Sequence, residues 1–346
     1  MLLEKQKNPT IRDVAREAGV STMTVTRAFR ENALITEKTR KRVVEAARKL
    51  KFIPDQNAKI LRGGSSMSIG ILMSNPSGSE LVRNLSVMLM KEGYVSFVAD
   101  SLGDIQIVKS ALMDFCSRKV GGVILSWRSY YRDIPEIMDL LNQLRNVVLY
   151  SYESEVRQEL IFDTCILDFS DAYRKAITEL INAGRRRIIY LGRDDQSQFH
   201  DFIEAVQDCG LKTEDCLWKT SGYPSKPAFA NYRDALHDKI LAGERPDAIF
   251  AANDIAAAQA CLCLREHNLR IPEDVAVIGS GNNYLGAFCS PALATIDTMS
   301  LAVSENIYAM LMPRIKQPDI KPQFKKVECL YIPRESAAVE KQKGHR

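Results

Sequence analysis

Residues 10–29 read Thr-Ile-Arg-Asp-Val-Ala-Arg-Glu-Ala-Gly-Val-Ser-Thr-Met-Thr-Val-Thr-Arg-Ala-Phe, a pattern that predicts two short amphipathic helices joined at Gly19. Thr10 and Asp13 have the spacing of a capping box at the start of the first helix, and Gly19 is suited to end that helix. Ser21 follows directly as a cap for the second helix. The turn between them is so short that it predicts a tight corner, the arrangement of a helix-turn-helix.

The second predicted helix has an apolar face and a polar face. Val25, Ala28 and Phe29 are spaced to be buried. The residues left pointing outward from its early turns are Thr22, Met23, Thr26, Arg27 and Arg30. On a helix that enters the major groove, Arg can fork onto guanine, Thr can donate or accept, and Met offers apolar contact. The alternative is a generic pair of surface helices with scattered basic residues; the agreement of caps, turn and polar face favours a DNA-reading head.

A third helix is predicted after a cap at Thr36, with Val43, Ala46 and Leu50 in its inner stripe, and it would close a small core. Arg40 on this helix is expected to contact phosphates rather than bases. Charge supports the assignment, because residues 1–64 hold 15 Lys and Arg against 7 Asp and Glu, whereas the rest of the chain holds 32 against 36. A basic head on an acidic body indicates a polyanion partner for the head alone.

Residues 54–66 read Pro-Asp-Gln-Asn-Ala-Lys-Ile-Leu-Arg-Gly-Gly-Ser-Ser, a segment of barely two helical turns that is stopped by glycines. A helix this short does not hold on its own in water. We therefore expect residues 55–62 to be unfolded in the free protein and to order on DNA. The alternative is a plain linker with one stray leucine.

Several of these segments together resemble the lactose-repressor (LacI) family of bacterial transcription regulators, and the resemblance covers nearly the whole chain. They are residues 10–27, Ile-Thr-Glu-Lys-Thr-Arg at 35–40, Phe-Ile-Pro at 52–54 and Ala-Lys-x-Leu-Arg at 58–62. The stretch around residues 22–30 looks closer to the gluconate-type members. The resemblance implies a bacterial transcriptional regulator, usually a repressor of carbohydrate-related genes, that binds a near-palindromic double-stranded DNA operator as a homodimer.

The resemblance also assigns roles to individual residues. The base-specifying positions of the family fall on Thr22 and Met23, and its recurring arginine falls on Arg27. The hinge helix of the family falls on residues 55–62, with Leu61 as the wedge that enters the minor groove and bends the duplex. The full set of expected DNA-contacting or helix-positioning residues is Thr10, Ser21, Thr22, Met23, Thr24, Thr26, Arg27, Lys59, Leu61 and Arg62.

From residue 67 onward, apolar β-rich runs alternate with helical stretches, which predicts parallel sheets with helices on both faces. The expected strands lie near residues 69–73, 95–99, 120–125, 147–150, 164–167, 187–191, 247–251 and 275–279. A body of about 280 residues is large enough for two α/β lobes, and the resemblance implies a periplasmic-binding-protein-like body. We expect a helix-turn-helix domain over 1–54, a hinge and linker over 55–66, and a two-lobed effector-binding and dimerisation domain over 67–346, with the lobes dividing near residues 163 and 297.

Polar side chains follow the predicted strands at their carboxyl ends, where ligands of open α/β sheets bind. The candidates for binding a small effector in the cleft are Asn75, Trp127, Asp168, Arg193, Asn253, Asp254 and Asn282. Carboxylates, amides and Arg with one aromatic ring suit a sugar, polyol or sugar derivative. The alternative for each residue is an ordinary solvated loop position.

Three departures from the family pattern lie in this pocket. Residues 77–80 replace a segment that usually carries an aromatic residue, Gln198 stands where the family has a sugar-gripping Arg, and Gly281 stands where it has an acidic residue. We therefore expect an unusual or weakly bound effector. The alternative is a DNA-binding regulator that has no small-molecule effector and is controlled by a protein partner or by its own abundance.

Other functional classes find little support. The eight cysteines show no zinc spacing, the four histidines are dispersed, and no catalytic motif or cofactor fingerprint occurs. We therefore expect no enzyme activity, no cofactor and no metal, and a cytoplasmic protein without membrane association; a sugar-binding transport protein or enzyme is the weakest alternative. The residues after Tyr331 contain no leucine heptad, so assembly should stop at the dimer. An apolar stripe at Leu81, Leu85, Met88 and Leu89 is either its interface or ordinary core.

Overall fold

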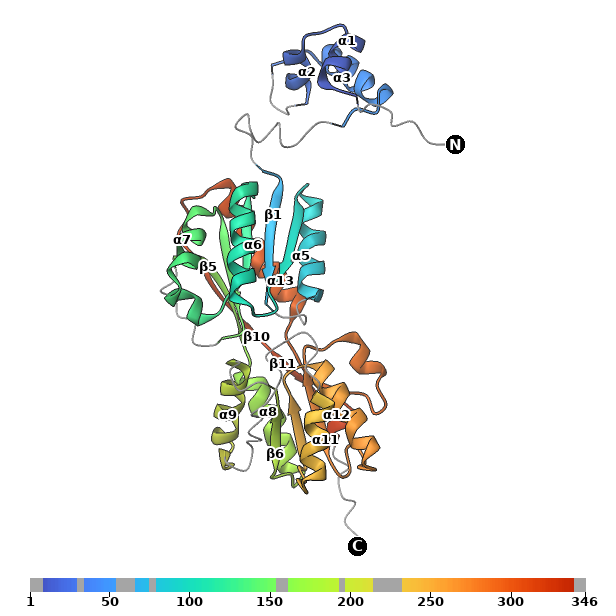
Figure 1. The fold of residues 1–346 in the computed structure, drawn as a ribbon, viewed down its shortest axis with the longest axis vertical. Coiled ribbons are helices and arrows are strands. Elements are labelled where there is room, and N and C mark those ends of the chain that lie inside the picture. The colour runs from blue at the N-terminus through green and yellow to red at the C-terminus, as the bar shows by residue number, and fades with distance from the viewer. Residues whose placement is uncertain are drawn as a thin grey trace. The chain divides into compact units, whose positions relative to one another are not determined.

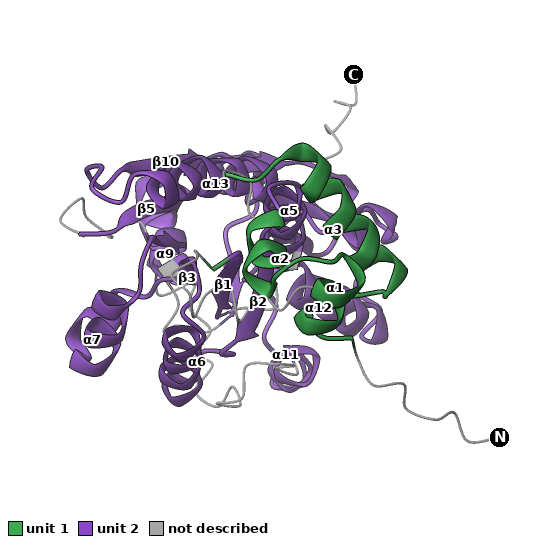
Figure 2. Ribbon diagram, turned by 90° about the horizontal axis from the view of Figure 1, so that it is seen from above, with its two compact units in different colours: residues 1–66 green, residues 67–346 purple. Residues whose placement is uncertain are grey.

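A computed structural model describes residues 9–29, 34–53, 66–74, 79–153, 161–192, 197–213 and 232–338 of the chain. The chain divides into two compact units, residues 1–66 and residues 67–346 (Figure 2). The described part of the first unit is all helical. The second unit contains two sheets, one entirely parallel and one with a single antiparallel strand, and both are covered by helices (Figure 1). No helix in the described ranges is long and apolar enough to cross a membrane.

The first unit contains α1 (Ile11–Glu17), α2 (Thr22–Ala28) and α3 (Glu37–Lys49). One residue from each helix forms the centre of its core, since Val14, Val25 and Val43 are fully buried. Alanines fill the space around them, which lets three short helices approach closely. The predicted helix-turn-helix is confirmed.

The helix ends form as the sequence predicts. The Asp13 carboxylate accepts from the Thr10 backbone amide at 2.9 Å, and the Ser21 hydroxyl accepts from the Thr24 amide at 3.1 Å. Gly19 adopts a φ of +59°, a left-handed conformation that residues with a side chain rarely take, and this conformation makes the tight corner.

The first sheet of the body is entirely parallel, in the order β10-β5-β4-β3-β1-β2. Its strands are β1 (Ser68–Met73), β2 (Val95–Asp100), β3 (Gly122–Ser126), β4 (Val147–Ser151), β5 (Asp163–Asp168) and β10 (Phe324–Glu328). One face packs on α5 (Ser79–Lys91) and α13 (Ser300–Lys316), and the other packs on α6 (Ile105–Arg118) and α7 (Pro135–Gln143).

The second sheet has the order β11-β9-β8-β7-β6. It contains β6 (Ile188–Leu191), β7 (Ala248–Ala251), β8 (Ala276–Ser280), β9 (Ala294–Asp297) and β11 (Leu330–Ile332), the last antiparallel to β9. Helices α8 (Ser170–Asn182) and α9 (Ser197–Asp208) cover one face, and α11 (Tyr232–Leu241) and α12 (Asp254–Glu266) cover the other. Short 3-10 turns include η4 (Tyr284–Phe288).

All eight predicted strands are present, and three further strands, β9, β10 and β11, escaped prediction. The chain passes between the sheets three times: after β5, after β9, and at Cys329 between β10 and β11. The first passage follows residue 168 rather than residue 163, because residues 163–168 form the buried strand β5 and pair with β4. Cys329 is buried, and its amide donates to the Asp168 carbonyl at 2.8 Å.

Candidate functional site

Helix α2 presents a polar face to solvent. Thr22 and Arg27 are exposed, and Met23 is 61% exposed, whereas Val25 and Ala28 on the opposite side are buried in the head. Among the described residues, none hydrogen-bonds or ion-pairs with the Arg27 guanidinium. A guanidinium group that has no acceptor within the described protein, on a helix held in place by the core, is available to donate to an acceptor on another molecule.

Neighbouring residues fix the position of this helix. The Ser21 and Thr24 hydroxyls lie 3.0 Å apart at its start, and the Thr26 hydroxyl donates to the Thr22 carbonyl at 3.0 Å. At its end, the Arg40 guanidinium donates to the Ala28 carbonyl at 2.7 Å. This half-buried side chain therefore ties α3 to the last turn of α2, and the expected phosphate contact of Arg40 stays a prediction.

The hinge lies outside the described residues, and with it the predicted contacts Lys59, Leu61 and Arg62. Thr10 is described and exposed, and both its amide and its hydroxyl donate to Asp13, at 2.9 and 2.6 Å. Its observed role is therefore the capping of α1.

In the body, the structure brings three of the predicted effector residues together at the carboxyl edge of the second sheet. Asp254 is buried, and its carboxylate accepts from the Thr295 hydroxyl at 2.6 Å and from the Asn283 amide at 2.5 Å. Burial raises the pKa of Asp254, although these two donors act against that rise. Asn253 caps α12 by accepting from the Ala256 amide at 2.9 Å.

Asn282 takes part in the same internal network. Its side-chain amide donates to Asp297 at 2.9 Å, and its carbonyl oxygen accepts from Arg334 at 2.6 Å. Gly281 beside it has a φ of +122°, a conformation in which any side chain is strained. A glycine therefore suits the backbone at this point, and the polar atoms of the cluster are largely engaged with one another.

The other predicted effector residues lie elsewhere. Asp168 at the end of β5 binds the Lys326 ammonium at 2.6 Å and the Ser170 hydroxyl at 2.8 Å. Trp127 is 1% exposed and packs edge-on against Tyr131 in the core of the first lobe, so its ring is not offered to a sugar face as expected. Asn75 and Arg193 lie outside the described residues.

A second group of buried polar residues at the carboxyl edge of the second sheet escaped prediction. Tyr190 is near the end of β6, Ser280 ends β8, and Tyr173 and Asp201 lie in the first turns of α8 and α9. Burial raises the pKa of Tyr173, and Tyr190 and Asp201 raise it further, which shows that the three groups are neighbours. The available signal was the position of Tyr190 and Ser280 within one residue of the ends of predicted strands 187–191 and 275–279.

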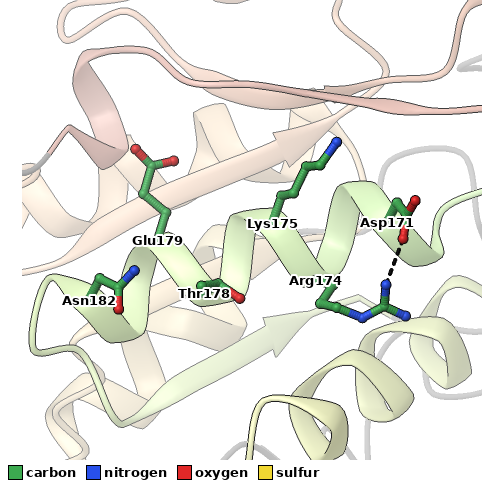
Figure 3. A pocket seen from close by; sticks show the side chains of 6 residues that line it. All are labelled: Asp171, Arg174, Lys175, Thr178, Glu179 and Asn182. Carbon is green, nitrogen blue, oxygen red and sulfur yellow. Dashed lines mark hydrogen bonds and ion pairs between the residues drawn. The ribbon is translucent and has the colours of Figure 1, made fainter.

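Among the hollows on the described part of the body are two that differ in shape and size. One of about 430 Å³ is an open depression whose lining residues all belong to α8 (Figure 3). The other lies at the edge of the first sheet, between Leu81, Tyr150, Tyr152 and Thr298, and has a volume of about 10 Å³. That is room for about one water molecule. Tyr152 stacks on Phe169 beside it, with ring centroids 6.2 Å apart.

Two further expectations have outcomes in the structure. Of the two alternatives for the apolar stripe of α5, the core holds, because Leu81, Leu85 and Leu89 are buried under the first sheet. The histidines are not all dispersed, because the packing of α11 on α12 brings His237 and His267 within 2.9 Å of each other. Thirty residues separate the two in sequence, so only tertiary structure could show this.

Sequence comparison finds two matching domain families. Residues 10–55 match the bacterial regulatory proteins of the lacI family, and residues 177–337 match the periplasmic binding protein-like domain. The HTH-type transcriptional repressor PurR of Aliivibrio fischeri is 30% identical over 321 residues, 90% of this chain and 93% of that protein. The ribose operon repressor of Escherichia coli is 28% identical over 338 residues, 95% and 99% of the two chains.

Solved structures share the fold. The lac repressor dimer bound to operator and the anti-inducer ONPF gives a TM-score of 0.79 at 20% identity, over 96% of this chain and 99% of that one. A LacI family regulator from Enterococcus faecium with bound ribose gives 0.65 at 22% identity, over 79% and 100%. The similarity to curated relatives therefore spans both the head and the body.

Proposed function

The chain belongs to the LacI family of bacterial transcriptional regulators, and on that basis we propose that it binds a near-palindromic operator as a homodimer and represses carbohydrate-related genes in the cytoplasm. The observation that carries the DNA-binding part is the exposed face of α2, where Thr22, Met23 and Arg27 point away from the core of the head. Two such helices related by two-fold symmetry read two half-sites about one helical turn apart.

The DNA-reading role is tested by selecting binding sites for the full chain from random duplexes. We expect a near-palindromic consensus. Replacing Thr22 and Met23 together should return a different consensus without abolishing binding, because these side chains read bases but do not hold the head together. An unchanged consensus would contradict their assignment.

The hinge proposal rests on family resemblance and on the sequence of residues 55–62, which is too short to hold as a helix on its own. Leu61→Ala should weaken operator binding and DNA bending while random DNA is bound almost as before, since the wedge acts only on a bent site. Ile60→Ala is the matched control. Equal losses on operator and random duplex, or equal losses in the two variants, would argue against a wedge.

Exposed apolar side chains support a dimer. β2 is an edge strand of the first sheet, and Val95, Phe97 and Val98 on it are 56%, 39% and 51% exposed; Met90 on the adjacent α5 is 68% exposed. An edge strand with such side chains pairs or aggregates unless something covers it. A second copy of the chain is the cover that a two-fold operator requires.

Sedimentation tests this surface. Met90→Glu should shift the full chain from dimer toward monomer and weaken operator binding, because it places a charge in the proposed interface. Met113→Glu on α6, where Met113 is 59% exposed, is the matched control and should stay dimeric. A tetramer stable on dilution, or dimerisation unaffected by Met90→Glu, would be incompatible with the proposed interface.

We further propose that a small effector, a sugar or sugar derivative, binds between the lobes against the buried polar residues at the carboxyl edge of the second sheet. Tyr173, Tyr190, Asp201 and Ser280 offer the hydroxyl and carboxylate groups that such a ligand needs. Closure of the lobes on it would change the separation of the two hinges.

The competing proposal, a regulator controlled by a protein partner or by abundance, is favoured by the internally bonded Asn282 and Asp254. A panel of sugars, sugar acids and sugar phosphates distinguishes the two. A compound that both raises the melting temperature of the full chain and changes operator anisotropy supports an effector. If no compound does either while the operator stays tightly bound, the partner-controlled alternative takes its place.

A further inference from the structure

Three potential metal ligands meet between α11 and α12. His237 Nδ1 and His267 Nε2 are 2.9 Å apart, and one ring nitrogen of each histidine and Cys263 Sγ all lie within 4.8 Å of one another. Cys263 is fully buried, and the two imidazole rings are half-buried, so the group sits at the rim of the packed interface between the helices. An ion can therefore reach the buried Cys263 thiol from the more exposed side of the cluster, where the two imidazole rings lie.

Regular secondary structure holds the three donors. Cys263 and His267 are four residues apart at the end of α12, a spacing that places both on one face of the helix, and His237 projects from α11 opposite them. The Arg233 guanidinium, one turn before His237, donates to the Glu266 carboxylate at 2.8, 3.1 and 3.2 Å. This fork joins the two helices beside the cluster and limits their relative movement.

We propose that His237, Cys263 and His267 form a binding site for a thiophilic divalent ion, with Zn²⁺ as the best match. Zn²⁺ prefers imidazole nitrogen and thiolate sulfur, and three protein ligands with a water in the fourth position are a common set. Tetrahedral bonds of about 2.0 to 2.3 Å place the donor atoms roughly 3 to 4 Å apart. The observed spacing meets that requirement after small side-chain rotations.

The ion replaces an existing interaction. Without it, the N–H of one imidazole donates a hydrogen bond to the ring nitrogen of the other across the 2.9 Å contact. When the ion binds, the donating ring moves that proton to its other nitrogen, and the Cys263 thiol releases its proton to solvent. Both ring nitrogens and the thiolate then face the metal.

This site is separate from the proposed effector residues. α12 begins at the carboxyl edge of the second sheet and is 13 residues long, so its far end lies roughly 20 Å from that edge. The ion would clamp α11 to α12 on the outer side of the lobe. The body would thus have a second small ligand whose binding does not depend on the effector or on DNA.

Cobalt spectroscopy on the tag-free, metal-free full chain tests the proposal. Co²⁺ should bind with one-to-one stoichiometry and give a thiolate-to-cobalt charge-transfer band together with the visible bands of tetrahedral Co²⁺. Cys263→Ala should lose the charge-transfer band, and His237→Gln or His267→Gln should weaken binding about 100-fold or more, since even outer-shell changes cost 10- to 100-fold. Cys261→Ala, two residues away on the same helix, is the matched control and should keep the band.

Thermal unfolding with Zn²⁺ gives a second readout that does not depend on the spectrum. Zn²⁺ should raise the melting temperature of the wild type and of Cys261→Ala by several degrees and leave Cys263→Ala and His267→Gln unchanged. The proposal is overturned if the wild type shows no charge-transfer band, if Cys263→Ala retains it, or if Cys261→Ala loses it equally. Circular dichroism identifies any variant that fails to fold, and the two histidine variants then decide.

Discussion

The head and the body use polar side chains in opposite ways. On α2, Arg27 has no hydrogen-bonding or ion-pairing partner among the described residues, and Thr22 and Met23 are exposed. At the carboxyl edge of the second sheet, Asp254 and Asn282 bond to neighbouring loops and strands. Both sets were predicted to bind a ligand, yet only the first has its polar groups available to one.

Stability and binding measurements together can recognise a binding surface. Removing a side chain that holds the fold together destabilises the protein. Removing a side chain that only contacts a ligand weakens binding and leaves stability unchanged. Measuring stability and binding for the same variant therefore distinguishes the two kinds of residue in both regions.

The largest effect is expected in the body. Asp254→Ala leaves the Thr295 hydroxyl and the Asn283 amide without their buried acceptor, and we expect the unfolding free energy of the body to fall by about 3 kcal/mol. Urea unfolding of the full chain measures it. Asp171→Ala on α8, where the carboxylate is 66% exposed, is the control and should change stability little. A stable Asp254→Ala protein would show that the carboxylate is held for a ligand after all.

Arg27→Ala should show the reverse pattern. We expect a loss of about 1 to 3 kcal/mol on the selected operator, with relaxed preference at one base pair and no change in the melting temperature of the head. Fluorescence anisotropy measures the affinity of wild type and variant for the operator and for random duplexes. An equal loss on the two duplexes would place Arg27 on phosphate instead.

Arg40→Ala tests a residue that lies in the basic head, like Arg27, and also bonds within the protein, like Asp254. Loss of its bond to the Ala28 carbonyl should destabilise the head by about 1 kcal/mol. The salt dependence of random-DNA binding tests the expected phosphate contact separately, and an unchanged slope would contradict it. A flatter salt slope would mean that Arg40 contacts phosphate as well.

The smallest effect is expected for Asp168→Asn. Burial opposes ionisation of Asp168, but the Lys326 ammonium and Ser170 outweigh it and lower the pKa of the carboxyl group. Because Lys326 is 53% exposed, the pair should stabilise the body by less than about 1 kcal/mol. A carboxyl group with a lowered pKa in the folded state stabilises above its ordinary pKa near 4 and loses that contribution as the pH falls through the lowered value. Urea unfolding should therefore separate wild type and variant at pH 7 and not near pH 2.

Sequence periodicity predicted the head and eight strands, because buried faces impose the spacing of Val14, Val25 and Val43 and the apolar runs of the sheets. It missed β10, whose Lys325 and Lys326 are exposed on an edge strand, and β9 and β11, which are only four and three residues long. Such strands are stabilised by pairing with strands that are distant in sequence, and their own alternation of apolar and polar residues does not reveal them.

Prediction of the candidate sites had the same limit. Local spacing placed Thr22, Met23 and Arg27 on one exposed face. Strand ends correctly brought Asp254 and Asn282 to one edge, but sequence could not show that Thr295, Asn283 and Arg334 would occupy their polar atoms. The grouping of His237 with His267 likewise depends on how two helices pack.

The short link at Cys329 has a consequence for the order in which the body is made. β10 completes the edge of the first sheet beside β5, and one residue later β11 begins to complete the edge of the second sheet beside β9. On the ribosome, both lobes must wait with an open sheet edge until residues 324–332 have emerged. Neither lobe can be completed before the other. A nascent chain paused just before these residues would therefore expose two unpaired sheet edges at once, each able to pair with another chain.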